Sequence, residues 1–236
     1  MKNIAIIGAG GGIGHAVLHQ CGAQYPAACI YTLSRTPLNN LPQNCQGLTI
    51  DITDETSIEA AADKIEASLD LIFVATGILH GEAIHPEKAL RDLDSAAMQK
   101  VFMRNTFGPA LLLKHFMPKL KKEERAVMAL LSARVGSIGD NKIGGWYSYR
   151  ASKAALNMII KCAAIEAARR FKHQIILGLH PGTVDTKLSE PFQGHVPEGK
   201  LFTPDYSAAQ MMSVLQKITP EDSGKILDYA GMEIEP

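Results

Sequence analysis

The sequence predicts an α/β fold, in which a doubly wound parallel sheet of about seven strands carries helices on both faces. Short apolar segments alternate with longer amphipathic segments along the chain. Several of the short segments are continuous apolar runs, as expected for parallel strands that are covered on both faces. The 236 residues are enough for a substantial core, and no linker or repeat divides them. We therefore expect one domain over residues 1–236.

The predicted strands are short, largely apolar and bounded by turn residues. They span Asn3–Gly8, Ala28–Leu33, Gly47–Asp51, Leu71–Ala75, Ala126–Ser132, Gln174–His180 and a last segment near Lys225–Tyr229. The predicted helices lie near Ile13–Gln24, Thr56–Ser68, Ser95–Lys121, Ser148–Phe171 and Pro204–Lys217. Right-handed crossovers in such a chain bring the carboxyl ends of all strands to one edge of the sheet, where ligands bind.

Composition and charge exclude several classes of function. Lysine and arginine together number 24, as do aspartate and glutamate, so the formal net charge is zero. A neutral chain gives no support for nucleic acid or a membrane surface as a partner. No apolar run reaches the roughly 18 residues of a membrane span, and the 4 cysteines form no C-x-x-C pair. The first strand follows directly on the initial methionine, which leaves no room for a targeting segment. We expect a cytoplasmic protein without a metal site.

A glycine-rich turn follows the first predicted strand, in Gly8-Ala-Gly10-Gly-Gly12-Ile13-Gly14. Glycine lets the backbone approach a pyrophosphate closely, and the start of the next helix supplies N–H donors. In this position the turn predicts a dinucleotide site of the Rossmann type; a purely structural glycine turn is the alternative. No lysine follows the glycines as it does in phosphate loops, which disfavours nucleotide hydrolysis.

The ends of the second and third strands favour NADP(H), although NAD(H) is possible. Folds that prefer NAD usually have a carboxylate at the end of the second strand, where this chain has Ser34 and Arg35. A guanidinium pairs with a 2′-phosphate that a carboxylate would repel; the alternative is that Arg35 is a solvated loop residue. Asp51 and Ile52 end the third strand, where Asp51 suits either the adenine amino edge or a turn.

Tyr149 and Lys153 stand four residues apart at the start of an alanine-rich predicted helix. This spacing places both side chains on one helix face. A nearby positive charge favours the phenolate and lowers a tyrosine pKa that is ordinarily about 10. The pair predicts a general acid and base, with an exposed lysine stem over a tyrosine ring as the alternative.

With these features the chain resembles the short-chain dehydrogenase/reductase family along nearly its whole length, and within it the C-factor-like carbonyl reductases. The family motifs fall in order on Gly8, Gly12, Ile13 and Gly14, on Asn105, on Tyr149 and Lys153, and on Pro181, Gly182, Val184 and Thr186. The resemblance implies that the segment from Pro181 to Thr186 binds the nicotinamide amide. It also implies that Lys153 holds the nicotinamide ribose and that Asn105 anchors a water linking Lys153 to solvent.

The chain departs from the family pattern at several positions. The threonine before the first glycine is Ile7, and the family's Asn-Asn-Ala-Gly turn is Val74-Ala75-Thr76-Gly77, where we still expect cofactor contacts from Ala75, Thr76 and Gly77. The usual catalytic serine aligns with Ala133. Either Ser132 or Ser137 would then serve, with Ser132 favoured and Ser137 next.

The resemblance implies an NADP(H)-dependent oxidoreductase that reduces an aldehyde, ketone or quinone, or oxidises the matching alcohol, with Tyr149 as general acid and base. A non-catalytic NADP-binding signalling protein of the C-factor type is the alternative. A sugar-nucleotide epimerase is disfavoured, because little chain follows Pro181 to form its substrate domain. We expect a substrate lid near residues 187–203 with Phe192 and Phe202 as apolar contacts, and a homodimer or homotetramer.

Overall fold

Seven strands pair in parallel at the centre of the structure, a computed structural model that describes residues 1–39 and 41–236, and for residue 195 the backbone alone. The strand order is β3-β2-β1-β4-β5-β6-β9. The strands are β1 (Asn3–Ile7), β2 (Cys29–Ser34), β3 (Cys45–Thr49), β4 (Leu71–Val74), β5 (Ala126–Leu131), β6 (Gln174–His180) and β9 (Ile226–Asp228). The predicted doubly wound parallel sheet is confirmed.

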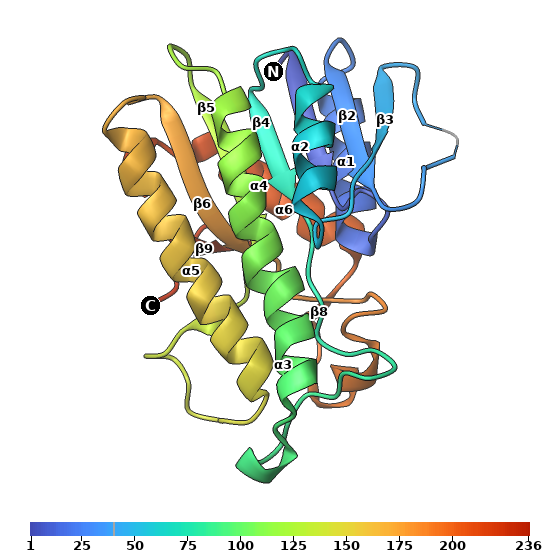
Figure 1. The fold of residues 1–236 in the computed structure, drawn as a ribbon, viewed down its shortest axis with the longest axis vertical. Helices are drawn as coiled ribbons and strands as arrows, with labels where there is room; N and C mark the ends of the chain where they lie inside the picture. The colour runs from blue at the N-terminus through green and yellow to red at the C-terminus, as the bar shows by residue number, and fades with distance from the viewer. Residues whose placement is uncertain (40) are drawn as a thin grey trace.

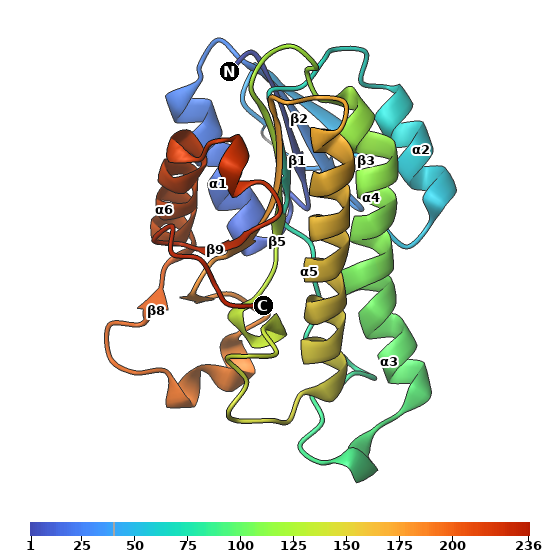
Figure 2. The ribbon, with the colours of Figure 1, turned by 90° about the vertical axis from the view of Figure 1, so that its left-hand side faces the viewer.

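Helices cover both faces of this sheet (Figures 1 and 2). One face carries α1 (Gly12–Gln24) and α6 (Pro204–Lys217), and the other carries α2 (Glu55–Asp63), α4 (Gly108–Phe116) and α5 (Tyr147–Ala168). Alternate side chains of β1 serve the two layers. Ile4 and Ile6 pack with the first pair of helices, whereas Ala5 and Ile7 pack with the second group. This alternation explains why β1 is apolar at every position from Ile4 to Ile7.

The strand order reverses at β1, which has β2 on one side and β4 on the other. Ile7 pairs with Leu33 of β2 and with Val74 of β4, so the residues that follow these three strands meet at one edge. The backbone continues the pairing there, because the N–H of Gly8 donates to the carbonyl of Leu33 at 2.8 Å. A crevice at such a switch point is where open α/β sheets bind ligands.

The segment predicted as one helix over Ser95–Lys121 is helical over most of its length, but it is not one regular α-helix, because it has four parts. The α-helix α3 (Ser95–Phe102) passes into a π-helical turn, η2 (Met103–Phe107), before α4 begins, and a 3-10 turn, η3 (Met117–Lys119), follows α4. Gly108 packs so closely on the backbone that a Cβ there would lie 2.6 Å from the carbonyl oxygen of Ile52, and Pro109 has no N–H to donate. Turns of this kind are frequent at functional sites.

The region of the predicted lid contains a small element that the sequence did not reveal. The strands β7 (Thr183–Val184) and β8 (Leu201–Phe202) form a separate parallel pair, and the 3-10 turn η5 (Glu190–His195) lies between them in the chain. The remaining short turns are η1 (Leu90–Asp92), η4 (Arg134–Gly136) and η6 (Pro220–Asp222). Within the ranges that the structure describes, we find no helix with both the length and the apolar character to cross a membrane.

Candidate active site

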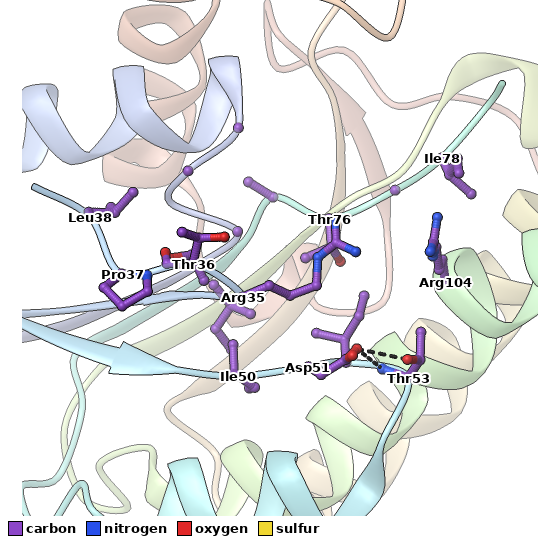
Figure 3. Close-up of a pocket in the computed structure, with 18 residues that line it drawn as sticks. Arg35, Thr36, Pro37, Leu38, Ile50, Asp51, Thr53, Thr76, Ile78 and Arg104 are labelled. Carbon is purple, nitrogen blue, oxygen red and sulfur yellow. Dashed lines mark hydrogen bonds between the residues drawn. The ribbon is translucent and has the colours of Figure 1, made fainter. Parts of the chain in front are cut away.

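A cavity of about 520 Å³ lies at the crevice beside β1 and β4 (Figure 3). Its walls are the glycine turn, the residues after β2 and β3, and the segment after β4. The predicted cofactor residues that line it are Gly8, Gly10, Ser34, Arg35, Asp51, Ile52, Ala75, Thr76 and Gly77. Four segments that are distant in the sequence therefore contribute to one cavity.

The glycine turn is packed too tightly for side chains at its ends. Gly8 has a φ of 87°, and a Cβ there would lie 2.7 Å from the carbonyl oxygen of Ala75. A Cβ on Gly14 would lie 2.2 Å from the carbonyl oxygen of Gly8, and one on Gly12 would lie 2.8 Å from the Cγ2 atom of Thr186. The predicted nicotinamide segment thus lies directly against the turn. Because α1 begins at Gly12 without an acidic residue in its first turn, its N–H groups suit an anion.

Two arginines reach the cavity, and sequence analysis identified only one of them. Arg35 follows β2, whereas Arg104 comes from the π-helical turn (Figure 3). The carboxylate of Asp51 accepts hydrogen bonds from the N–H and the hydroxyl of Thr53, at 2.9 and 2.7 Å. These bonds, and then the charges of Arg35 and Arg104, lower the pKa of Asp51. One oxygen of Asp51 is therefore used by a turn, and the cavity combines two positive charges with one negative charge.

Thr76, in the wall of the cavity, has a buried polar atom. The hydroxyl of Thr76 is buried and has no hydrogen-bond partner within the described residues. An unsatisfied buried hydroxyl costs free energy unless a ligand or water completes it. The hydroxyl of Ser34, by contrast, donates to the carbonyl of Thr36.

Tyr149 and Lys153 lie in the first turns of α5, with the lysine nitrogen 5.9 Å from the centre of the tyrosine ring. Lys153 is buried and donates to the carbonyl of Leu131, at the end of β5, at 2.9 Å. Lys153 is packed against Gly136, because a Cβ on Gly136 would lie 2.8 Å from the Cβ of Lys153. Lys153 is thus held in the core, whereas Tyr149 is half-buried.

Burial, and not the neighbouring charge, dominates the two pKa values. Desolvation raises the pKa of Tyr149 to about 12 and lowers the pKa of Lys153 to about 8. The expected lowering of the tyrosine pKa by its amine neighbour is therefore wrong for the protein without ligands. The sequence predicts the spacing of the pair, but the depth at which the fold buries it is a tertiary property.

Asn105 is fully buried in the π-helical turn and ties the segment after β4 to α5. Its side-chain oxygen accepts from the N–H of Ile78 at 2.8 Å, and its amide donates to the carbonyl of Ile78 and to the hydroxyl of Ser152. A Cβ on Gly77 would lie 3.5 Å both from this oxygen and from the Lys153 nitrogen. The structure thus brings Asn105, Lys153 and Gly77 together.

The two candidate serines differ in what their hydroxyls do. Both are buried. The hydroxyl of Ser132 donates to the side-chain oxygen of Asn157 at 2.5 Å, which uses its only proton. The hydroxyl of Ser137 accepts from the N–H of Asp140 at 3.0 Å, which leaves its own proton available. In this arrangement Ser137 is the better hydrogen-bond donor.

The two aromatic residues of the predicted lid lie in different surroundings. Phe192 in η5 contacts Trp146, with 4.9 Å between ring centres. Phe202 in β8 packs instead on Tyr229 and Tyr206, at 4.7 and 4.9 Å, and over Gly182. Only Phe192 belongs to the surroundings of Tyr149. Among the described side chains, no group of three or more His, Cys, Asp or Glu residues is placed to hold a metal ion.

Comparison with known proteins gives consistent results. A family model described as "short chain dehydrogenase" matches residues 2–196. The 1-hydroxy-2-glutathionyl-2-methyl-3-butene dehydrogenase of Rhodococcus sp. (strain AD45) is 31% identical over 241 residues, which is 95% of this chain and 95% of that protein. The C-signal protein of Myxococcus xanthus is 35% identical over 146 residues, which cover 62% of this chain and 82% of that protein.

Solved structures share the fold over the whole chain. An NADPH-bound carbonyl reductase from chicken fatty liver has a TM-score of 0.86 and 24% sequence identity, with 100% of this chain and 94% of that one covered. The carbonyl reductase Sniffer of D. melanogaster has a TM-score of 0.85 and 22% identity, with 100% of both chains covered. At these identities the likeness establishes the fold.

Proposed function

Because the chain belongs to the short-chain dehydrogenase family of oxidoreductases, we propose that it reduces the carbonyl group of a small molecule with NADPH as the cofactor. The observation that carries the proposal is the Tyr149–Lys153 pair, whose lysine nitrogen lies beside Gly77 in the wall of the glycine-lined cavity at the end of β1. The Rhodococcus relative, which is named a dehydrogenase, and the structurally similar carbonyl reductases support it.

The cavity fits a phosphorylated dinucleotide. The glycine turn and the start of α1 provide room and N–H groups for a pyrophosphate, and the unpartnered hydroxyl of Thr76 provides one further hydrogen bond. Arg35 would pair with the 2′-phosphate that distinguishes NADPH from NADH, and Arg104 adds a second positive charge to the same cavity. The segment from Pro181 to Thr186 would hold the nicotinamide end.

The cofactor supplies a hydride to the carbonyl carbon, and the protein then has to deliver one proton to the oxygen. Tyr149 donates that proton as a general acid, and the product is an alcohol. Lys153 stays charged below its pKa of about 8 and stabilises the phenolate that remains. A serine hydroxyl, Ser132 or Ser137, stabilises the negative charge that develops on the oxygen, and Asn105 holds the segment that separates Lys153 from the cavity.

The resting form of Tyr149 is the protonated phenol, which is the form that carbonyl reduction requires. With its pKa raised to about 12, Tyr149 is fully protonated near neutral pH and is ready to act as an acid. Oxidation of an alcohol would need the phenolate, which burial disfavours. The same residue can act in both directions, but in this environment the protonated form is the resting one.

A non-catalytic signalling protein that binds NADP is a second candidate. The similarity to the C-signal protein favours it, as does Ala133 at the position where the family has its serine. The intact Tyr149–Lys153 pair argues against it, since a protein that only binds the nucleotide does not need a general acid.

Consumption of NADPH in the presence of aldehydes, ketones and quinones separates the two candidates. The proposal expects turnover with at least one class of carbonyl compound, a lower rate with NADH, and formation of the alcohol in equal amount to the NADPH consumed. Binding of NADPH without turnover on any carbonyl class would instead support the signalling protein. Absence of binding to either nucleotide would contradict both.

A further inference from the structure

Three aromatic side chains from separate segments form a row of contacts that begins at Tyr149. Trp146 precedes α5, Phe192 lies in η5, and His80 follows β4. The ring of Trp146 lies 6.3 Å from that of Tyr149 and 4.9 Å from that of Phe192, and His80 lies 5.7 Å from Phe192. We call Trp146, Phe192 and His80 the aromatic wall.

The backbone of Trp146 is strained in a way that keeps its ring in this place. With φ at 51°, it is the only non-glycine residue of positive φ in the described part of the chain. Gly144 and Gly145, just before it, have the same left-handed conformation, which is free of steric cost for glycine alone. Strain of this kind persists where the surroundings impose it, and it is concentrated at functional sites.

Glu87 supplies the contacts that hold this strained turn. Its carbonyl accepts from the N–H of Trp146, and its carboxylate accepts from the N–H and the hydroxyl of Ser148. Glu87 is buried at the N-terminus of α5, where a negative charge is favourable. One residue therefore fixes the positions on both sides of Tyr147 and sets the direction in which Trp146 points.

The wall also connects the substrate side of the crevice to the predicted lid. The Nε2 atom of His80 forms a hydrogen bond of 2.9 Å with the carbonyl of Lys187, where the predicted lid begins. Phe192 comes from within that same segment. The three rings thus link Tyr149, through Trp146 and Phe192, to the segment in which the predicted lid begins.

We propose that the aromatic wall receives a planar aromatic group attached to the substrate's carbonyl carbon, so that the enzyme prefers aryl ketones and aryl aldehydes to saturated ones. This inference rests on the proposed function, because it places the carbonyl oxygen at Tyr149. Trp146 is inclined by 77° to Tyr149 and by 62° to Phe192. These rings contact one another directly, so an aryl ring would pack against the wall, where it would meet aromatic edges and faces of the kind that attract each other.

Two ketones of the same carbon skeleton test the preference: acetophenone, whose ring is planar and aromatic, and cyclohexyl methyl ketone, whose ring is saturated. We expect kcat/KM to be about 3- to 10-fold higher for acetophenone, the range that one aromatic pair adds beyond area burial. Trp146→Leu and Phe192→Leu should remove this ratio while binding of NADPH is kept. Tyr206→Leu, which replaces an exposed aromatic residue outside the wall, should leave the ratio unchanged.

A binding measurement decides the inference without turnover. Trp146 is the only tryptophan of the chain, so intrinsic fluorescence reports on the wall directly. We expect acetophenone to quench this fluorescence saturably, and Phe192→Leu to weaken the affinity for acetophenone. Cyclohexyl methyl ketone should displace acetophenone only at a higher concentration. This result supports the wall even if no NADPH is consumed, in which case the proposed function alone fails.

The inference that the aromatic wall binds an aryl group would be overturned by equal affinities for the two ketones. It would also be overturned if Trp146→Leu lowered kcat/KM equally for both. Turnover would then still support carbonyl reduction, with the aromatic residues acting only as packing for the lid. Thermal unfolding of each variant shows whether it is folded, and the affinities of the wild-type protein for the two ketones decide the inference even if a variant is not.

Discussion

Lys153 donates a hydrogen bond to the carbonyl of Leu131 while its nitrogen lies 5.9 Å from the centre of the Tyr149 ring. The helix α5 is thereby tied to the end of β5, and the lysine is fixed within reach of the cavity. Lys153 is buried and Tyr149 is half-buried, and desolvation shifts their pKa values in opposite directions, the phenol upward and the amine downward. The acid is therefore protonated and its neighbour charged near neutral pH.

Replacement of the phenol tests the general acid. Tyr149→Phe should lower kcat by about 100- to 10,000-fold, the range that a positioned acid contributes. Affinity for NADPH should change little, because the hydroxyl is proposed to act on the substrate. Steady-state kinetics and titration calorimetry with NADPH measure the two quantities. Undiminished reduction by this variant would exclude Tyr149 as the acid.

The two arginines of the cavity should affect the cofactors differently. Arg35→Glu should raise the KM for NADPH about 10- to 100-fold and spare NADH, because only NADPH has the phosphate that a charged hydrogen bond recognises. Arg104→Leu should weaken the binding of NADPH and NADH to a similar extent, since we expect Arg104 to contact a part of the dinucleotide that both cofactors share. Arg91→Ala, a highly exposed residue away from the cavity, is the control. If Arg104→Leu selectively lost affinity for NADPH, the contact with the 2′-phosphate would be reassigned to Arg104.

The hydrogen bonds of the two serines predict which one serves the substrate. Because the proton of Ser132 is used by Asn157 and that of Ser137 is available, Ser137→Ala should lower kcat by about 100-fold, as loss of an oxyanion donor does. Ser132→Ala should mainly lower the melting temperature, since it leaves the half-buried side-chain oxygen of Asn157 without its donor. The kinetics and thermal unfolding of both variants provide the comparison. The reverse pattern would show that Ser132 turns away from Asn157 when substrate binds.

The lysine should set the alkaline limit of the reaction. Burial lowers the pKa of Lys153 to about 8, so its charge is present below that value and is lost as the pH rises through it. The kcat/KM for NADPH, which reports on the free enzyme, should fall about tenfold per pH unit above about 8. Tyr149, with its pKa near 12, contributes nothing in this range. In Lys153→Arg the decline should disappear, because a guanidinium stays charged; a decline that remains would point to another group.

The α4 and α5 region has exposed apolar residues on the surface through which a homodimer or homotetramer is predicted to form. Met158 and Ile165 on α5 and Phe107 before α4 are each about half exposed or more. Association through this face stays a prediction, which sedimentation of the purified protein would test.

Much of the fold follows from the sequence because its signals are local. Apolar runs such as Ile4–Ile7 and Leu71–Val74 identify strands that are buried on both faces. The glycines around Gly8 mark the only kind of residue that the close approach to Ala75 allows. Right-handed connection of such units then brings the glycine turn, Arg35 and Asp51 to one edge, which is why the cavity could be predicted without coordinates.

The features that only the tertiary structure decided depend on contacts between distant segments. Packing of Gly108 on Ile52 accompanies the break in the predicted long helix, and the π-helical turn there brings Arg104 into the cavity. The depth of burial reversed the expected shift of the Tyr149 pKa. The aromatic wall exists because Glu87 holds Trp146 in a conformation that no local preference favours. Sequence spacing determined which chemical groups face the crevice, whereas desolvation and long-range packing decided their protonation and the shape of the space around them.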